Sequence, residues 1–248
     1  GIGHMTNRPF PGVYNHDKGL YGYRGTLNRH CVTLAEVLKK QGYHTYMSGK
    51  WHLGSHGKQK WPTYRGFDKY YGILWGACNY FVPNDPAFQL VRKGELIEPD
   101  VKDYYTTDVF TDYAINYVKN QEDDKPFFLY LAYNAPHWPL HARKEDVDRF
   151  IGNYKKGWDV IRKQRFQKQF KKGVIKEKWN LSPRDPEVRD WESLSDEKKK
   201  EMDYRMAVYA TQIYSIDYNL GRMLDSLEEE GELENTLILF LSDNGGCA

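Results

Sequence analysis

The sequence predicts an α/β fold, a three-layer sandwich with a largely parallel, mixed central sheet that is incomplete in this chain. Three segments repeat one order, in which a stretch of helical periodicity is followed by a short apolar run. Helices that alternate with strands in this way favour a parallel sheet. Each apolar run also ends in polar residues, which parallel strands bring to one edge of the sheet.

The first segment predicts a helix that leads into a strand. Leu34, Val37 and Leu38 recur at helical spacing in TLAEVLKKQG, and Gly42 marks the end of that helix. The next run, YHTYMS, predicts a strand that delivers Lys50 and His52.

The second segment repeats this order over residues 106–139. The stretch TTDVFTDYAINYVKN places Phe110, Tyr113, Ala114 and Tyr117 on one helical face. The run PFFLYLAY is apolar throughout and predicts a strand buried on both faces. This strand delivers His137 in NAPHWP.

The third segment predicts a long helix, a strand and a polar end. The helix is expected to reach about Glu230, and the strand TLILFL to be buried on both faces before SDNGG, which contains Asp243 and Asn244. The apolar stripe of the helix is formed by Met202, Met206, Tyr209, Ile213, Ile216, Leu220 and Leu227.

Further segments lie between these units. The stretch 64–83 is rich in aromatic residues and glycine, and residues 87–99 predict a hairpin that turns at Lys93-Gly94. A helical insertion from Arg149 to Lys178 holds eleven Lys or Arg and two acidic residues. Its aromatic residues leave nucleic-acid binding open, but the spacing of Trp158, Ile161, Phe166 and Phe170 favours an amphipathic helix with a solvated basic face.

Composition limits the classes of function. The length of 248 residues suits one α/β domain over 1–248, and the net charge of +2 gives no overall field that would attract nucleic acid or an anionic membrane. We therefore expect neither partner. Cys31, Cys78 and Cys247 lie far apart, so a zinc site or a disulfide framework is not indicated and one disulfide at most can form.

The polar residues after the three strands suggest one chemistry. Lys50, His52 and His137 can hold an anion, whereas the oxygens of Asp243 and Asn244 suit a hard cation such as Ca²⁺ or Mg²⁺. An anionic ester bound next to a metal cation would use both sets of residues. Each residue alone has an ordinary explanation, a solvated lysine, a structural histidine or an SDNG turn, but their joint occurrence at three strand ends favours a site.

In these residues the sequence resembles the sulfatase family, and bacterial arylsulfatases of the alkaline phosphatase superfamily in particular. GYHTYMSGKWHLG, residues 42–54, is similar to the second signature of that family. The resemblance continues in family order through GIGHMTNRP, GYRGTLNRHCVTLAEVLKKQGY, GFDKYYG, YYTTD, LAYNAPHWPLHA and TLILFLSDNGGCA.

The resemblance implies a role for each site residue. Asp243 and Asn244 would be Ca²⁺ ligands, and Lys50 would bridge the substrate sulfate and the catalytic residue. His52 would orient the hydroxyl of that residue, and His137 would bind sulfate or assist the leaving group. The substrate would be a small-molecule or glycan sulfate ester. A location in the periplasm or outside the cell is favoured over the cytoplasm.

The sequence departs from the family pattern at both ends. The pentapeptide Cys/Ser-x-Pro-x-Arg, which supplies a formylglycine nucleophile in the family, is absent, as are an N-terminal aspartate pair and a downstream lysine. We therefore expect a piece of a catalytic domain that is inactive by itself. Two alternatives stay open: a phosphonate or phosphodiester hydrolase of the same superfamily, and an inactive module that binds anions or a partner.

Overall fold

The structure, a computed structural model, describes residues 26–82, 89–99, 102–176 and 179–245. The predicted features at residues 1–9, 22–25, 83, 87–88, 177–178 and 246–248 lie outside these ranges. The chain divides into two compact units, one formed by residues 1–141 and 214–248 and the other by residues 142–213. We describe each unit by itself.

The first unit contains a mixed sheet of five strands in the order β4-β3-β2-β1-β5. β1 pairs in parallel with both β2 and β5, whereas β2, β3 and β4 pair antiparallel. The predicted α/β class and mixed sheet are thereby confirmed. The strands are β1 His44–Gly49, β2 Lys69–Ile73, β3 Leu90–Arg92, β4 Glu95–Leu96 and β5 Phe127–Ala132.

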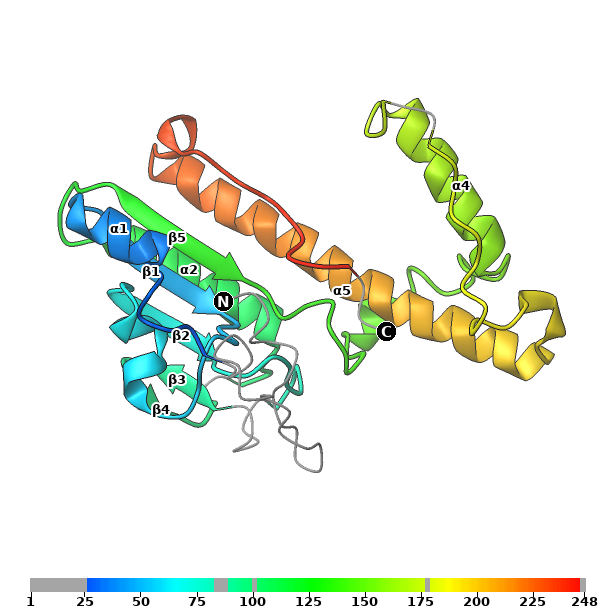
Figure 1. Cartoon of the computed structure of the whole chain (residues 1–248), viewed down its shortest axis with the longest axis horizontal. Helices are drawn as coiled ribbons and strands as arrows, with labels where there is room; N and C mark the ends of the chain where they lie inside the picture. Colours follow the sequence, from blue (N-terminus) through cyan, green and yellow to red (C-terminus); the bar gives the residue numbers. More distant parts are fainter. Residues whose placement is uncertain (1–25, 83–88, 100–101, 177–178, 246–248) are drawn as a thin grey trace. The chain divides into compact units, whose positions relative to one another are not determined.

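Two helices cover opposite faces of this sheet (Figure 1). Consecutive residues of β1 enter different apolar clusters. Tyr46 belongs to a cluster with Phe110 of α2, Thr106–Lys119, and Met47 to a cluster with Ala35 of α1, Leu34–Lys40. Side chains alternate between the faces of a strand, so each cluster lies on one face. The predicted three layers are present in this unit.

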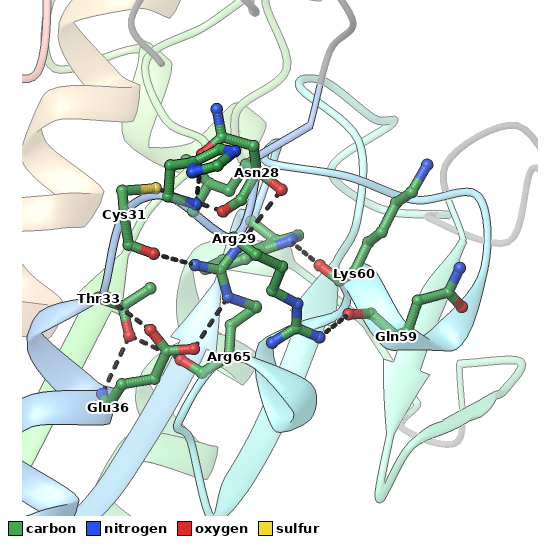
Figure 2. Close-up of polar contacts among 11 residues, drawn as sticks. Asn28, Arg29, Cys31, Thr33, Glu36, Gln59, Lys60 and Arg65 are labelled. Carbon is green, nitrogen blue, oxygen red and sulfur yellow. Dashed lines mark hydrogen bonds and ion pairs between the residues drawn. The ribbon is translucent and has the colours of Figure 1, made fainter. Parts of the chain in front are cut away.

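The start of α1 is fixed by a network of hydrogen bonds (Figure 2). Thr33 and Glu36 form a capping box, in which each side chain accepts a hydrogen bond from the backbone N–H of the other. The Glu36 carboxylate also accepts a hydrogen bond at 3.0 Å from Nε of Arg65, whose side chain is buried and donates to the carbonyl of Cys31 as well. The network ties the loop before β2 to the first turn of α1.

The sequence prediction located most elements but missed one strand. Helices are found at both predicted positions before β1 and β5, and the hairpin turns at Lys93-Gly94. β2 was not predicted, because its residues lie in a stretch where aromatic residues and glycine obscure the alternating pattern. The short helices are η3 Lys58–Lys60, η4 Pro62–Tyr64, η5 Trp191–Ser193 and η6 Leu233–Asn235.

The second unit is helical and has a small core. It contains α3, Lys144–Val147, and α4, Trp158–Lys171, and most of its remaining regular structure belongs to α5, Asp196–Glu229, which continues into the first unit. Val147, Ala207 and Val208 form the buried cluster. The buried Asp203 carboxylate accepts hydrogen bonds from the backbone N–H groups of Gly152 and Tyr154, which hold the loop before α4.

The buried face of α5 differs from the predicted apolar stripe. Of that stripe only Leu227 is buried, and Ile213 is 47 % exposed. The buried face is instead lined at four-residue spacing mostly by small and polar residues, which are Asp203, Ala207, Thr211, Ser215 and Asn219, and it ends in the apolar Met223. The pattern of hydrophobicity did not anticipate this face, because its polar side chains are satisfied by hydrogen bonds, both local, as from Thr211 Oγ1 to the Ala207 carbonyl, and distant, as from Asn219 Nδ2 to Asp108.

The predicted third strand is absent. Residues 236–241 form no strand, and Leu237, Leu239, Phe240 and Leu241 are each more than 70 % exposed. The prediction of a doubly buried β5 is also wrong, since β5 is an edge strand whose residues are half-buried and Tyr130 is 45 % exposed. The two errors have one cause: a run that is apolar throughout is buried only where a strand or helix covers it, and no described strand pairs with the outer edge of β5.

The described residues include no helix that is long and apolar enough to cross a bilayer.

Candidate functional site

Lys50 lies where β1 ends beside β5. Gly49 is opposite Ala132 in the parallel register, and the backbone N–H of Lys50 donates to the Ala132 carbonyl at 2.7 Å. Gly49 has a φ of +118°, and a Cβ there would overlap the backbone of Ala132. Glycine therefore permits the close approach of the two strands that fixes the position of Lys50.

His52 follows in an unusual backbone conformation. Its φ is 51°, which is uncommon for a residue with a side chain, and its N–H donates to the carbonyl of Leu74, directly after β2. The ring of His52 lies against Gly76, where a Cβ would overlap it. The end of β2 and the glycine beyond it thus set the orientation of His52.

His137 lies in the loop after β5. Its N–H donates to the Asn134 carbonyl at 2.9 Å, and its own carbonyl accepts a hydrogen bond at 2.7 Å from the hydroxyl of Tyr80. Nδ1 of its ring is 2.7 Å from the carbonyl oxygen of Trp138. Since a carbonyl only accepts, Nδ1 carries a hydrogen, and Nε2 is the basic nitrogen of the neutral ring.

Asp243 and Asn244 lie in an exposed segment with local hydrogen bonds. The Ser242 hydroxyl donates to the Asn244 carbonyl, and Nδ2 of Asn244 donates to the carbonyl of Gly245. Burial raises the pKa of Tyr130 in β5, and the negative charge of Asp243 raises it further. Asp243 is therefore near β5, although the strand that was expected to deliver it is not formed.

The oxygens of Asp243 and Asn244 are of the kind that Ca²⁺ prefers, but their number is too small. Calcium takes about six to eight oxygen ligands. Within the described ranges no group of three or more His, Cys, Asp or Glu side chains could hold a metal ion. These residues do not form a complete calcium site by themselves.

The sheet places the segments that carry part of the predicted set at one edge. The carboxyl ends of β1 and β5 lie at one edge of the sheet, as parallel neighbours must; Lys50 and His52 follow β1, and His137 lies in the loop after β5. The end of β2 contributes to the same edge, which the sequence did not indicate. Asp243 and Asn244 were predicted to lie at the same edge. The sheet does not place them there, because residues 236–241, which precede them, form no strand.

Sequence reasoning also missed the residues that support His137. His141 is half-buried and packs against Tyr80 and Phe81, and burial lowers its pKa. Cys78 is fully buried, accepts a hydrogen bond from Nδ2 of Asn134, and has its thiol pKa raised by burial to about 12. The high content of aromatic residues in the stretch 64–83 could have indicated that this segment is packed against its surroundings rather than an exposed loop.

Comparison with known proteins gives a consistent result. A sequence model of the Sulfatase family matches residues 8–247. The chain is 37 % identical to an uncharacterised sulfatase of Schizosaccharomyces pombe, covering 99 % of this chain and 46 % of the relative, and 33 % identical to an arylsulfatase of Klebsiella aerogenes, covering 94 % and 51 %. The crystal structure of Ps i-CgsB in complex with k-i-k-neocarrahexaose aligns with a TM-score of 0.58 and 29 % identity, over 86 % of this chain and 40 % of that one.

The chain thus spans about half the length of the curated relatives that it matches.

Proposed function

Because the chain belongs to the sulfatase family, we propose that the full-length protein is an arylsulfatase-like sulfuric ester hydrolase that cleaves sulfate monoesters. The observation that carries the proposal is the parallel pairing of β1 with β5, which brings to one sheet edge the two strand ends that precede Lys50, His52 and His137. One cationic and two imidazole side chains suit a sulfate group, which is bound by charge and hydrogen bonds. Ps i-CgsB, to which the chain is similar, binds a neocarrahexaose, which supports a glycan as one class of substrate beside small aryl sulfates.

Each of the three residues has a distinct role in the proposed reaction. The Lys50 ammonium group stabilises negative charge on the sulfate oxygens and bridges to the nucleophile. His52, fixed by the end of β2, orients the hydroxyl of the nucleophile. When Nε2 carries a proton, His137 donates a hydrogen bond to a sulfate oxygen, or transfers that proton to the leaving oxygen as the bond between sulfur and that oxygen breaks.

The nucleophile is proposed to be a formylglycine derived from Cys or Ser in a segment N-terminal to this chain. The state of Cys78 supports this, because a buried thiol with a pKa of about 12 is protonated at neutral pH and is a poor nucleophile. Cys31 lies outside the sheet edge, in the network around Arg65 (Figure 2). The 248-residue chain by itself is therefore expected to be inactive.

Asp243 and Asn244 are proposed as two ligands of a Ca²⁺ ion whose remaining ligands lie outside the described residues. A cation bound there would neutralise part of the charge on the sulfate oxygens. Calcium titration by calorimetry should detect weak or no binding to this chain and tight binding to the full-length protein. Asp243→Asn in the full-length protein should weaken that binding, and unchanged affinity would exclude Asp243 as a ligand.

The catalytic roles can be tested by kinetics of the full-length protein. Lys50→Ala should lower kcat/KM for 4-nitrocatechol sulfate by about 100-fold or more. His137→Ala should affect an alkyl sulfate more than this aryl sulfate, because the poorer leaving group needs the proton more. Lys40→Ala, an exposed lysine at the end of α1, serves as the control and should leave kcat/KM unchanged. Full activity of Lys50→Ala would refute the proposal.

The alternative, a phosphonate or phosphodiester hydrolase, is tested with the same protein. The proposed sulfatase should turn over an aryl sulfate much faster than an aryl phosphodiester. The reverse preference would favour the alternative.

A further inference from the structure

The second unit carries a strongly basic segment that the proposed reaction does not use. Nine of residues 155–176 are Lys or Arg, and one, Asp159, is acidic. Asp159 is already paired with Arg184, which lies outside the segment. The excess of positive charge is therefore uncompensated within the segment.

Three of these cations form a stripe along α4, the last of them, Lys172, at the C-terminal cap directly after the helix. Arg165, Lys168 and Lys172 are all exposed, and they follow one another at intervals of three and four residues, which places them on the same helical face. The stripe extends over about 10 Å of the helix axis. None of the three makes an ion pair with an acidic residue in the part of the chain that the structure describes. We call Arg165, Lys168 and Lys172 the basic stripe.

The position of α4 within its unit is held by contacts at the start of the helix. Trp158 packs edge to face against Trp191 with ring centroids 4.9 Å apart. Arg162, on the next turn, donates to the carbonyl and the hydroxyl of Ser182. The helix is thus fixed by its first two turns, and the basic stripe lies on the second half.

Ordinary helix stability explains only part of this arrangement. Lys168 in the last turn interacts favourably with the helix dipole. However, like charges three or four residues apart repel each other on a helix, and no acidic residue of α4 lies at such spacing from Arg165, Lys168 or Lys172. The repulsion would be relieved by a partner that carries closely spaced negative charges.

The aromatic residues of α4 disfavour a nucleic acid as that partner. Phe166 and Phe170 are half-buried and pack edge to face, with centroids 5.2 Å apart. Helical spacing places them on roughly the opposite side of α4 from the basic stripe. Single-stranded nucleic acids are held by aromatic side chains that stack with bases beside the cations, and this arrangement is missing on the described stripe.

We propose that the basic stripe of α4 binds the polyanionic chain of a sulfated polysaccharide, and so acts as a secondary substrate-binding surface on the second unit. The choice of polyanion rests on the proposed function, because a hydrolase of glycan sulfate esters acts on chains that carry repeated sulfate groups. Exposed cations attract such groups by charge, and their summed effect is reduced by salt. The polysaccharide is thereby held at points other than the ester that is cleaved.

The test measures binding without turnover. Fluorescein-labelled heparin is titrated with the 248-residue chain at low and at high salt, with uncharged dextran and a single-stranded oligo(dT) as competitors. The wild-type chain should bind heparin, lose affinity as salt rises, and be displaced poorly by either competitor. The triple substitution Arg165→Gln, Lys168→Gln, Lys172→Gln should raise the apparent Kd about tenfold.

A matched control separates the stripe from net charge. Lys40→Gln, Lys93→Gln, Lys102→Gln removes the same charge from exposed lysines of the first unit and should change the Kd by about twofold or less. A second variant, Arg165→Lys, keeps the charge and should bind as the wild type does. Circular dichroism should show equal helix content in all variants, since glutamine favours helices.

The proposal would be overturned if the wild-type chain did not bind heparin, or if both triple variants lost heparin affinity equally. It would also be overturned if oligo(dT) displaced the labelled heparin as effectively as unlabelled heparin does, which would indicate a nucleic-acid surface. Because the assay needs no hydrolysis, its outcome is independent of the proposed activity. Heparin binding by the stripe together with a full-length protein that cleaves no sulfate ester would contradict the proposed function alone.

Discussion

At the scale of single residues, Gly49 controls the geometry behind Lys50. Gly49→Ala would place a Cβ on the Ala132 backbone at a φ of +118°, which neither the strand pairing nor the side chain can accommodate. We expect a loss of several kcal/mol or failure to fold, measured by urea unfolding. Gly94→Ala is the matched control, because its φ is also positive but its Cβ would meet nothing within 4 Å. It should cost about 1 kcal/mol, and equal losses in the two variants would show that strand contact is unimportant.

Asp68 is a second residue whose effect can be measured, through pH. Burial opposes ionisation of Asp68, but hydrogen bonds from Lys39 and Thr45 outweigh it and lower its pKa. The ionised carboxylate accepts from the Thr45 N–H at 2.9 Å and so joins the starts of β1 and β2. A lowered folded-state pKa stabilises the fold above the unfolded value of about 3.9, and this stability is lost as the pH falls through the folded-state pKa.

Asp68→Asn should therefore destabilise the chain by about 1 kcal/mol at pH 7, and the difference from wild type should shrink as the pH falls below about 4. Chemical unfolding at several pH values measures both the loss of stability at pH 7 and its decrease at low pH. Asp217→Asn, an exposed residue of α5, should have no effect at either pH. A difference that persists unchanged at pH 3 would show that the charge of Asp68 is not its cause.

The sequence predicted where the candidate site residues lie in the fold better than it predicted their environments. Lys50, His52 and His137 were predicted to follow β1 and β5, because the point where each apolar run gives way to polar residues marks the end of its strand. The left-handed backbone of His52, the wall formed by Tyr80 and the burial of His141 depend on contacts from residues far along the chain. Such contacts leave no local pattern.

At the scale of elements, the apolar run 236–241 shows where periodicity fails. Its composition is that of a buried strand, yet Leu239 is 76 % exposed, since burial requires a neighbouring element and not only an apolar sequence. An exposed run of this kind, beside a sheet with an open edge at β5, favours aggregation.

Leu239→Lys tests this arrangement in the 248-residue chain. The substitution should raise solubility, measured as the concentration at which light scattering begins, because it interrupts the apolar run with a charge. The free energy of unfolding should stay within about 0.5 kcal/mol, as for other exposed positions. Leu74→Lys, at a fully buried position, should prevent folding. Strong destabilisation by Leu239→Lys would show that the run is buried in solution, as the sequence alone suggested.

At the scale of the whole molecule, the two compact units have separate cores. The first unit contains the clusters on both faces of the sheet, whereas the described core of the second is centred on Val147, Ala207 and Val208. A core of this size supplies little stability. The division could not be predicted from the sequence, because α5 has continuous helical periodicity across the boundary.

Calorimetry should therefore resolve two unfolding transitions rather than one, with the second unit melting first. Val147→Ala removes two buried methyl groups and should destabilise the second unit by about 2 kcal/mol. For a unit of this size that loss lowers the first transition by about 10 °C. Leu74→Ala, in the core of the first unit, should lower only the second transition. If each variant shifted both transitions together, the units would unfold as one cooperative body, because α5 would then transmit the loss of either core to the other.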